Sequence, residues 1–437
     1  MDYHQRLLMS VAQSLAPQTV PRRRWGIACL LGFGVLVNFF DRVNLTVAHD
    51  ALHATFNIST VTYGYLLSAY IWTYAACQIP VGVLLDRFGV KKVGRIGAFV
   101  WSMGSFAGAA APSLWFLFPA RFLLGIGEAP TFPANAKAIG YWFPKSERSL
   151  ATAIFDAAAK FANAIGVPIV GVLLIHFGWR WSFAATGCAS FTYFLLYYFF
   201  YRNPSEDRRL SDAERRYILK GGAQPEGTQS SGAGAPLSYL LWQKKVVGLS
   251  LGFAAYNYTF YLLLTWMPSY LSMALHIDLL HSVLYTSVPW LIATVTDLAI
   301  GGLLVDALLQ RGWQGVRRFV LIAGMCFGVG IFGVAGAHTP RAAVFWISFS
   351  LAGLAAAAPV AWSIPSLIAP RESVGRIGGI MNFWSQVAAI TAPILTGYFV
   401  ALTHSFKGAF VVAAAFLVIG IAAYAFLLGR IEPIPEP

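Results

Sequence analysis

The sequence predicts an all-α integral membrane protein in which twelve transmembrane helices form two pseudo-symmetric six-helix bundles. Three observations lead to this prediction. The 437 residues are 57% hydrophobic and only 11% charged, with a mean hydropathy of +0.63, whereas a soluble protein carries about 25% charged residues. The apolar residues fall into twelve long runs, and motifs in the first six runs return in the last six. Such a composition excludes a disordered chain, a collagen-like chain and a small disulfide scaffold.

Each apolar run is long enough to cross the hydrocarbon core of a membrane, which is about 30 Å thick and takes a helix of about 20 residues. Several runs are rich in Gly and Pro, which membrane helices tolerate when neighbouring helices satisfy the freed backbone groups. The predicted spans are 25–49, 61–85, 93–111, 114–140, 150–175, 181–201, 246–272, 282–308, 318–337, 342–368, 375–401 and 406–429.

The basic residues orient these spans. With a cytoplasmic N-terminus, 24 of the 31 Lys and Arg residues fall in cytoplasmic segments, and only Arg180, Arg341 and Lys407 fall outside. Because cytoplasmic loops carry the excess of Lys and Arg, both termini are expected to be cytoplasmic. The predicted domains are a cytoplasmic tail (1–24), a first bundle (25–201), a cytoplasmic linker (202–245), a second bundle (246–429) and a second tail (430–437).

The linker is polar, and we expect a short surface helix near Asp212–Lys220 followed by a flexible Gly-rich stretch. A net charge of +13 would suggest nucleic-acid binding in a soluble protein. Here the basic residues stand in short loops between apolar runs, so nucleic acid is not an expected partner.

No feature of the chain predicts catalysis. The four cysteines, Cys29, Cys77, Cys188 and Cys326, are far apart in apolar runs, so we expect small core residues rather than a metal site or a disulfide framework. A Gly-x-Gly at 125–127 lies in a predicted membrane helix, not after a strand, so it is not a nucleotide loop. We therefore expect no catalytic residue, no metal and no cofactor.

One repeated motif points to a gate. Gly82-Val-Leu-Leu-Asp86-Arg87 ends the second span and continues as Phe-Gly89-Val-Lys91-Lys92, and Gly302-Leu-Leu-Val-Asp306 ends the eighth. The first motif resembles the signature loop of the major facilitator superfamily, so the resemblance implies the major facilitator fold. Charge pairs made by Asp86 and the basic residues beyond it can lock the cytoplasmic face and break when the halves rock. The expected gating residues are Gly82, Asp86, Arg87, Lys91 and Asp306; the alternative is a cluster of charges that only sets topology.

Three further segments are similar to the anion:cation symporter family, which includes hexuronate, galactonate and glucarate transporters and sialin-like carriers. They are Asn38-Phe-Phe-Asp41-Arg42-Val-Asn44, Arg121-Phe-Leu-Leu-Gly125-Ile-Gly127-Glu128-Ala-Pro130-Thr-Phe-Pro133-Ala-Asn135 and Phe177-Gly178-Trp179-Arg180-Trp-Ser-Phe. The resemblance implies a monomer in a bacterial inner membrane that couples protons to uptake of a small organic anion by alternating access. Hexuronates, aldonates and aldarates are the expected substrates. The alternatives are aromatic or dicarboxylic acids, sodium coupling and, less favoured, a channel or a membrane enzyme.

Charged side chains inside the spans are costly, by about 2.5–3.5 kcal/mol on insertion scales, and therefore indicate function. Asp41 and Arg42 are neighbours in the first span, and Arg121 and Glu128 lie two turns apart on one face of the fourth. The resemblance implies that Asp41 and Glu128 are proton sites. It also implies that Arg42 holds a substrate carboxylate and that Arg121 is the partner of Glu128 or a substrate ligand. The alternative is a set of structural ion pairs.

Asp156, Lys160 and Asp297 depart from the family pattern. Asp156 and Lys160 are spaced i,i+4 in the fifth span, which favours a pair between them. Lys160 stands where galactonate-type members carry a substrate-binding glutamine. It is expected either to hold a second substrate carboxylate or to pair with Asp156 or Asp297.

Uncharged polar residues in other spans complete the expected substrate site. Tyr74 in the second span matches a substrate contact of the family, and Trp362 and Asn382 match the spacing of sugar-acid contacts. Polar residues in membrane helices equally serve to join helices. The remaining candidates of this kind are Tyr256, Asn257, Ser363 and Gln386.

Overall fold

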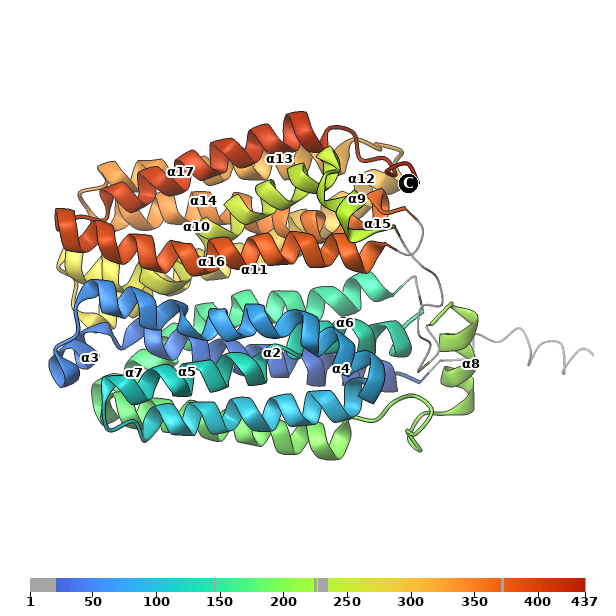
Figure 1. Ribbon diagram of the computed structural model, residues 1–437, viewed down its shortest axis with the longest axis horizontal. Coiled ribbons are helices and arrows are strands. Elements are labelled where there is room, and N and C mark those ends of the chain that lie inside the picture. Colours follow the sequence, from blue (N-terminus) through green and yellow to red (C-terminus); the bar gives the residue numbers. More distant parts are fainter. Residues whose placement is uncertain (1–20, 145–146, 224–225, 227–234, 371–372, 437) are drawn as a thin grey trace, which may run out of the picture.

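Long helices that run roughly parallel to one another build the protein, in two groups that follow each other along the sequence (Figure 1). The computed structural model describes residues 21–144, 147–223, 226, 235–370 and 373–436, and no strand occurs among them. The all-α prediction is confirmed. The helices divide into a first half before residue 201 and a second half after residue 243.

The described part of the first half contains six passes made by five helices, together with the short helix α3. Their bounds are α2 (Arg23–Val47), α3 (His49–Phe56), α4 (Thr60–Ala109), α5 (Leu114–Glu128), α6 (Thr131–Trp142) and α7 (Arg148–Phe200). The long helices α4 and α7 each hold two passes that meet at a kink, at Gly89 (φ 76°) and Gly178 (φ 79°). Glycine adopts positive φ without the steric cost that a Cβ brings, so both kinks need it. The pass formed by α5 and α6 is interrupted at Ala129 and Pro130.

The second half also contains six passes. Their elements are α10 (Lys244–Leu275), α11 (Leu279–Thr296), η1 (Asp297–Leu304), α12 (Val305–Gln310), α13 (Val316–Gly328), η2 (Val329–Gly336), α14 (Pro340–Ser363), α15 (Pro365–Ile368), α16 (Val374–Thr403), α17 (Lys407–Ala422) and η3 (Ala423–Leu428). The wide π-helical turn η1 begins at Asp297. Such turns are rare inside helices and frequently mark functional sites.

Many of these helices are long and apolar enough to cross a membrane. Within the described residues eight helical stretches meet this condition, and the longest, Ala151–Phe200, contains two passes. The others are Arg23–Val47, Lys244–Leu275, Leu284–Leu309, Val316–Gly336, Pro340–Ser363, Arg376–Thr403 and Lys407–Leu428.

The linker is attached to both halves. Its helix α8 (Asp212–Lys220) has the bounds expected from the sequence, and Ser211 caps it by accepting a hydrogen bond from the Glu214 amide. Glu214 in turn accepts hydrogen bonds from the backbone amides of Arg23 and Arg24, which begin α2. Further along, α9 (Leu237–Leu241) packs on α10 and α16 of the second half. Most of the Gly-rich stretch between them lies outside the described residues.

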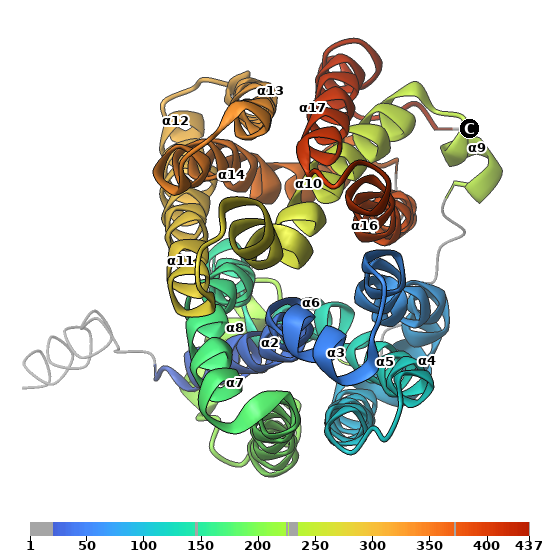
Figure 2. The same cartoon turned by 90° about the vertical axis from the view of Figure 1, so that its left-hand side faces the viewer.

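The two halves contact each other most extensively through two helix pairs, α4 with α16 and α7 with α11 (Figure 2). Smaller contacts join α2 to α10 and α7 to η1. At the end of the bundle that carries α3, glycines bring the backbones together. A Cβ at Gly64 would lie 2.7 Å from the Pro393 carbonyl oxygen, and one at Gly397 would lie 2.8 Å from that of Thr60. Small residues let membrane helices approach closely, so the halves are in tight contact at this end.

The expectation that the four cysteines are core residues is wrong. Cys29, Cys188 and Cys326 are exposed on the bundle surface, and Cys77 is partly exposed. In a membrane protein the outer surface faces lipid and is as apolar as the core. An apolar run therefore does not tell which of its residues face inward.

Candidate functional site

Asp41 and Arg42 of α2 lie buried in the middle of the first half, and α4, α5 and α7 surround them. Asp41 is 3% exposed, Arg42 5%, Arg121 5% and Glu128 0%. These four residues, which the sequence selects from two separate spans, are therefore brought together at one place. Each arginine contacts a residue of the other helix.

Arg42 and Glu128 form a buried ion pair between α2 and α5. Glu128 Oε2 lies 3.0 Å from Arg42 Nε and 2.9 Å from Nη2. The Arg42 guanidinium also lies near the rings of Phe39, Tyr70 and Tyr74, at 4.5, 5.2 and 5.5 Å from the ring centroids. Because these aromatic faces attract the cation, Arg42 is held firmly in an otherwise apolar surrounding.

The same guanidinium reaches the second half of the protein. Arg42 Nη1 donates a hydrogen bond of 3.3 Å to the Tyr261 hydroxyl on α10. The ion pair with Glu128 is therefore at the interface of the two halves, the place where transporters built from repeats bind their substrates.

Asp41 has a different environment, although it is the neighbour of Arg42. Ser105 Oγ on α4 donates to one carboxylate oxygen at 2.7 Å, and Ser190 Oγ on α7 donates to the other at 2.6 Å. Within the described part of the chain no cation pairs with this carboxylate. A hydroxyl can donate to a carboxylate or accept from a carboxylic acid, so the two serines can satisfy Asp41 in either protonation state.

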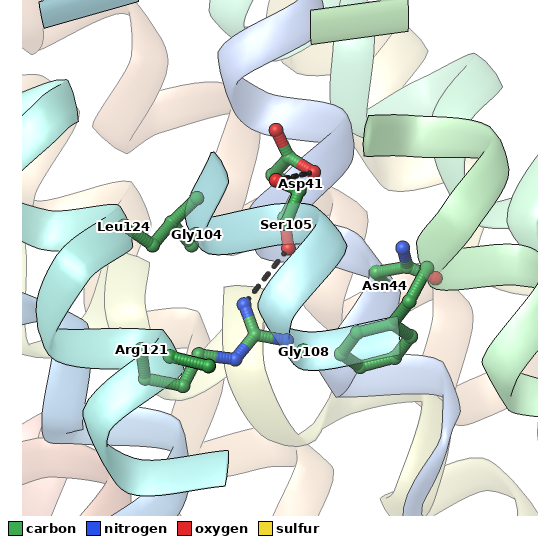
Figure 3. A pocket seen from close by; sticks show the side chains of 9 residues that line it. Asp41, Asn44, Gly104, Ser105, Gly108, Arg121 and Leu124 are labelled. Atoms are coloured by element: carbon green, nitrogen blue, oxygen red, sulfur yellow. Dashed lines mark hydrogen bonds between the residues drawn. The ribbon is translucent and has the colours of Figure 1, made fainter. Parts of the chain in front are cut away.

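Arg121 lies beside Asp41 but contacts its backbone. Arg121 Nη1 donates to the Asp41 carbonyl oxygen at 3.1 Å, and the guanidinium stands 5.0 Å from the centroid of the Phe183 ring. Its Nη2 is buried without a hydrogen-bond partner in the structure. A cavity of about 10 Å³ lies beside the side chains of Asp41 and Arg121 (Figure 3). This volume is roughly the space that one water needs. The cavity is lined by Asp41, Asn44, Gly104, Ser105, Gly108, Ala120, Arg121, Leu124 and Phe183.

The position of Arg121 shows why it does not pair with Glu128, one of the two roles that the resemblance implied for it. The separation of seven positions between them corresponds to about 10 Å along a helix axis. Glu128 therefore meets Arg42, and Arg121 meets the α2 backbone one residue earlier in the chain. The ion pair of the site joins two helices rather than two turns of α5.

A second buried cluster lies between α7 and η1. Lys160 Nζ is 2.9 Å from Asp156 Oδ2 on its own helix and 2.5 Å from Asp297 Oδ2 in the second half. Lys160 and Asp297 are each 4% exposed. Both expected pairs are therefore present, and one of them connects the halves.

The polar residues of the second half are mostly engaged with one another or with backbone. Asn257 donates to the Ser385 carbonyl oxygen at 2.8 Å and thereby joins α10 to α16. Asn382 accepts hydrogen bonds from Ser385 and Gln386. Ser363 donates to the Val360 carbonyl oxygen within α14. In this structure, these polar side chains therefore join helices or stabilise a single helix.

Aromatic residues occupy the same region of α10 and α14. Tyr256 stacks against Phe253 with 5.4 Å between ring centroids, and Trp362 meets Phe253 edge-on at 5.2 Å. Trp362 remains 46% exposed. Its indole is thus not enclosed by other side chains, unlike the side chain of Asn257.

Two serines of the site were not predicted from the sequence. Ser105 and Ser190 stand in apolar runs of α4 and α7, 64 and 149 positions from Asp41. Serine is common at contacts between membrane helices, so its presence in a span carries no signal of a partnership with Asp41.

The expected gate is described only in part. The side chains of Asp86 and Asp306 lie outside the described residues. Arg87 stands over the Phe88 ring at 5.3 Å, and a Cβ on Gly82 would contact nothing within 4 Å. Lys91 pairs with Glu206 of the linker.

Comparisons with known proteins show related transporters over almost the whole chain. An uncharacterized transporter of Bacillus subtilis, YybO, is 39% identical over 94% of this chain and 95% of its own length. The probable galactarate/D-glucarate transporter GudP of the same organism is 32% identical, with 94% and 92% covered. A D-galactonate transporter of Escherichia coli O6:H1 is 31% identical, with 94% and 97% covered.

The fold has solved counterparts, and a family model identifies it. A bacterial homologue of the lysosomal transporter Spinster, in an inward-facing and unoccupied conformation, superposes with a TM-score of 0.75 at 17% identity, covering 94% of this chain and 97% of that one. The family model of the Major Facilitator Superfamily matches residues 31–393. With its twelve helical passes in two halves, the chain belongs to the Major Facilitator Superfamily of membrane transporters.

Proposed function

We propose that this protein is a proton-coupled symporter that takes up a small organic anion, a sugar acid, by alternating access. The sugar-acid assignment is supported by relatives named for galactarate, D-glucarate and D-galactonate. In this proposal α8 and both termini face the cytoplasm, because that orientation places 24 of the 31 Lys and Arg residues on the cytoplasmic side.

The observation that carries the proposal is the buried ion pair of Arg42 and Glu128 at the interface of the halves. Arg42 is a suitable ligand for a carboxylate, because its planar guanidinium donates two parallel hydrogen bonds to one. Glu128 already pairs with this guanidinium, through its Oε2 atom. A substrate carboxylate that takes Arg42 therefore leaves the Glu128 carboxylate buried without its cation.

A proton on Glu128 resolves this conflict. An unpaired buried charge is costly, and protonation removes it. Substrate and proton thus favour each other at this site, which is the linkage that symport requires. Asp41, held by two hydroxyls that suit either protonation state, is proposed as the second proton site.

The test separates coupling from transport. Asp41→Asn and Glu128→Gln remove one proton site each while preserving shape. In proteoliposomes, uptake of glucarate or galactonate driven by a pH gradient is compared with counterflow exchange, which needs no gradient. Each variant is expected to lose gradient-driven accumulation, and at least one is expected to retain exchange.

A control carboxylate stands outside the site. Asp50 in α3 is 66% exposed at its side chain, and Asp50→Asn is expected to accumulate substrate as the wild type does. If Asp41→Asn and Glu128→Gln both accumulate substrate with the pH dependence of the wild type, the proposed coupling sites are wrong. Accumulation that follows a sodium gradient instead of a pH gradient would overturn proton coupling itself.

A further inference from the structure

An open groove on the outer surface of the first half has the composition of a lipid site. It has a volume of about 620 Å³ and lies between the second pass of α4 and the end of α7. Its lining residues are Phe88, Gly89, Lys91, Lys92, Arg95, Ile96, Phe99, Phe194, Tyr198, Asn203 and Glu206. Three of these are cations and one is an anion, so the groove carries a formal charge of +2. The groove takes no part in the site around Arg42.

The groove has more cations than carboxylates to pair with them. Lys91 is paired with Glu206. Lys92 is exposed, and within the described part of the protein its contact is the Phe88 ring at 5.0 Å, with no carboxylate. Arg95 stands over the Tyr198 ring at 4.4 Å, and its Nε is buried without a hydrogen-bond partner.

A fourth cation stands at the edge of the groove, close to Arg95. Arg95 Nη2 and Arg202 Nη1 both donate to the carbonyl oxygen of Tyr198, at 2.7 and 2.9 Å. Two guanidinium groups on one oxygen repel each other, and among the described residues no carboxylate pairs with either of them. An anion bound here would relieve this repulsion.

Charge and apolar surface are separated along the groove. Lys91, Lys92 and Arg95 stand in the first two turns after the kink at Gly89, at the end of the bundle that carries the linker. Ile96 and Phe99 follow toward the middle of the bundle, and they are 55% and 43% exposed on the surface that faces lipid. Phe99 lies about 10 Å along the helix from Lys92, so one ligand with a charged head and an apolar tail can contact both.

From this arrangement we infer that the groove binds an anionic phospholipid. The phosphodiester lies against Lys92, Arg95 and Arg202, and an acyl chain follows Ile96, Phe99 and Phe194 into the bilayer. Basic pockets between helices at the cytoplasmic surface are suited to anionic headgroups, and arginine suits phosphate because its donors are arranged as a planar fork. A free phosphate ion uses only the charged end and leaves the apolar wall without a ligand.

Native mass spectrometry of the purified full-length protein tests this inference. The protein is mixed with phosphatidylglycerol or with phosphatidylcholine carrying the same acyl chains. We expect phosphatidylglycerol to bind about tenfold more tightly, because both lipids offer the same phosphodiester but the choline of phosphatidylcholine adds a cation that the basic groove repels. The variant Lys92→Gln/Arg95→Gln is expected to lose this preference, whereas Lys244→Gln/Arg311→Gln, which removes two cations at the same end of the second half, is expected to keep it.

Three results would overturn the inference: equal binding of the two lipids by the wild type, an unchanged preference in Lys92→Gln/Arg95→Gln, or the same loss in both double variants. If Arg95→Gln prevents folding, the exposed Lys92→Glu is used alone and is expected to weaken phosphatidylglycerol binding. Inorganic phosphate at millimolar concentration is included in a thermal-stability assay. Protection by phosphate equal to that by phosphatidylglycerol would identify an ion site and contradict a lipid site. Because the readout is lipid binding, the result does not depend on whether the protein transports a sugar acid.

Discussion

Lys160 in α7 and Asp297 in η1 form a buried ion pair that joins the two halves of the protein, with 2.5 Å between Nζ and Oδ2. Lys160 keeps a second carboxylate, Asp156, on its own helix. When the halves separate, Lys160 thus retains a partner, whereas Asp297 loses one. The cluster allows the interface to open without leaving the lysine unpaired.

This asymmetry predicts the order of three variants in thermal stability. Lys160→Gln leaves two carboxylates without a cation and is expected to lower Tm most, since breaking a buried pair costs about 3–5 kcal/mol. Asp297→Asn removes one partner and leaves the pair with Asp156, so its effect is expected to be smaller. Asp156, whose side chain is 21% exposed, is expected to tolerate Asn best. A variant Lys160→Gln that is more stable than Asp297→Asn would contradict this account.

The arginines of the site are expected to be required for substrate binding. Arg42→Gln and Arg121→Gln each remove a buried guanidinium, so the shift in Tm that a bound sugar acid produces should disappear. Arg42→Lys separates charge from geometry: it keeps a cation for Glu128 but loses the planar fork, and binding is expected to weaken at least about tenfold.

The control for this experiment is Arg180→Gln. Arg180 is a cation whose Nη2 donates to the Ala111 carbonyl oxygen, away from the site. Normal binding by both Arg42→Gln and Arg121→Gln would show that the substrate binds elsewhere.

The glycine contact between α4 and α16 is expected to control the equilibrium between conformations. Gly64→Ala and Gly397→Ala place a methyl group within 2.7 and 2.8 Å of backbone oxygens of the opposite half, so the end that carries α3 cannot close fully. Ser269 of α10, which is 3% exposed and lies beside Tyr63 of the opposite half at this end, is replaced by Cys after the four native cysteines are changed to Ser. Its labelling by a water-soluble maleimide should accelerate in both glycine variants.

Gly379→Ala serves as the matched control in the same helix, because a Cβ there meets no atom within 4 Å. Its labelling rate should equal that of the parent protein. Equal rates in all three glycine variants would indicate that this contact does not limit opening.

The contact between α2 and the start of α7 predicts a pH-dependent contribution to stability. The hydrogen bond from the Arg24 guanidinium, 2.7 Å from Glu147 Oε2, lowers the pKa of the Glu147 carboxyl from its ordinary value, and Tyr217 adds a second donor. Because the pKa is lower in the folded protein, this contribution is complete above the unfolded pKa of about 4.3. It is lost as the pH falls through the folded value.

Glu147→Gln is therefore expected to lower Tm by about 1–3 °C at pH 7, and the difference from the wild type should shrink as the pH falls below about 4. Glu206, which pairs with Lys91 and is 46% exposed at its side chain, provides the comparison. Glu206→Gln should change Tm less, since exposed ion pairs contribute little. A difference for Glu147→Gln that grows toward acid pH would reverse the sign of this argument.

Local properties of the sequence suffice to place the membrane-crossing segments and to single out the charged side chains within them. A span needs a long apolar run, and charged side chains within such a run are costly enough to be rare. Both properties are local, so the twelve spans, the linker helix at Asp212–Lys220 and the set Asp41, Arg42, Arg121 and Glu128 could be predicted from it.

Which of these groups pair depends on how the helices pack against one another. Arg42 meets Glu128 across 86 positions, Asp41 meets Ser105 and Ser190, and Lys160 selects both Asp156 and Asp297. Partnership depends on the rotation and depth of each helix against its neighbours, which packing sets and which hydropathy does not record. For the same reason the sequence did not distinguish the lipid-facing cysteines from core residues, because in a membrane both surroundings are apolar.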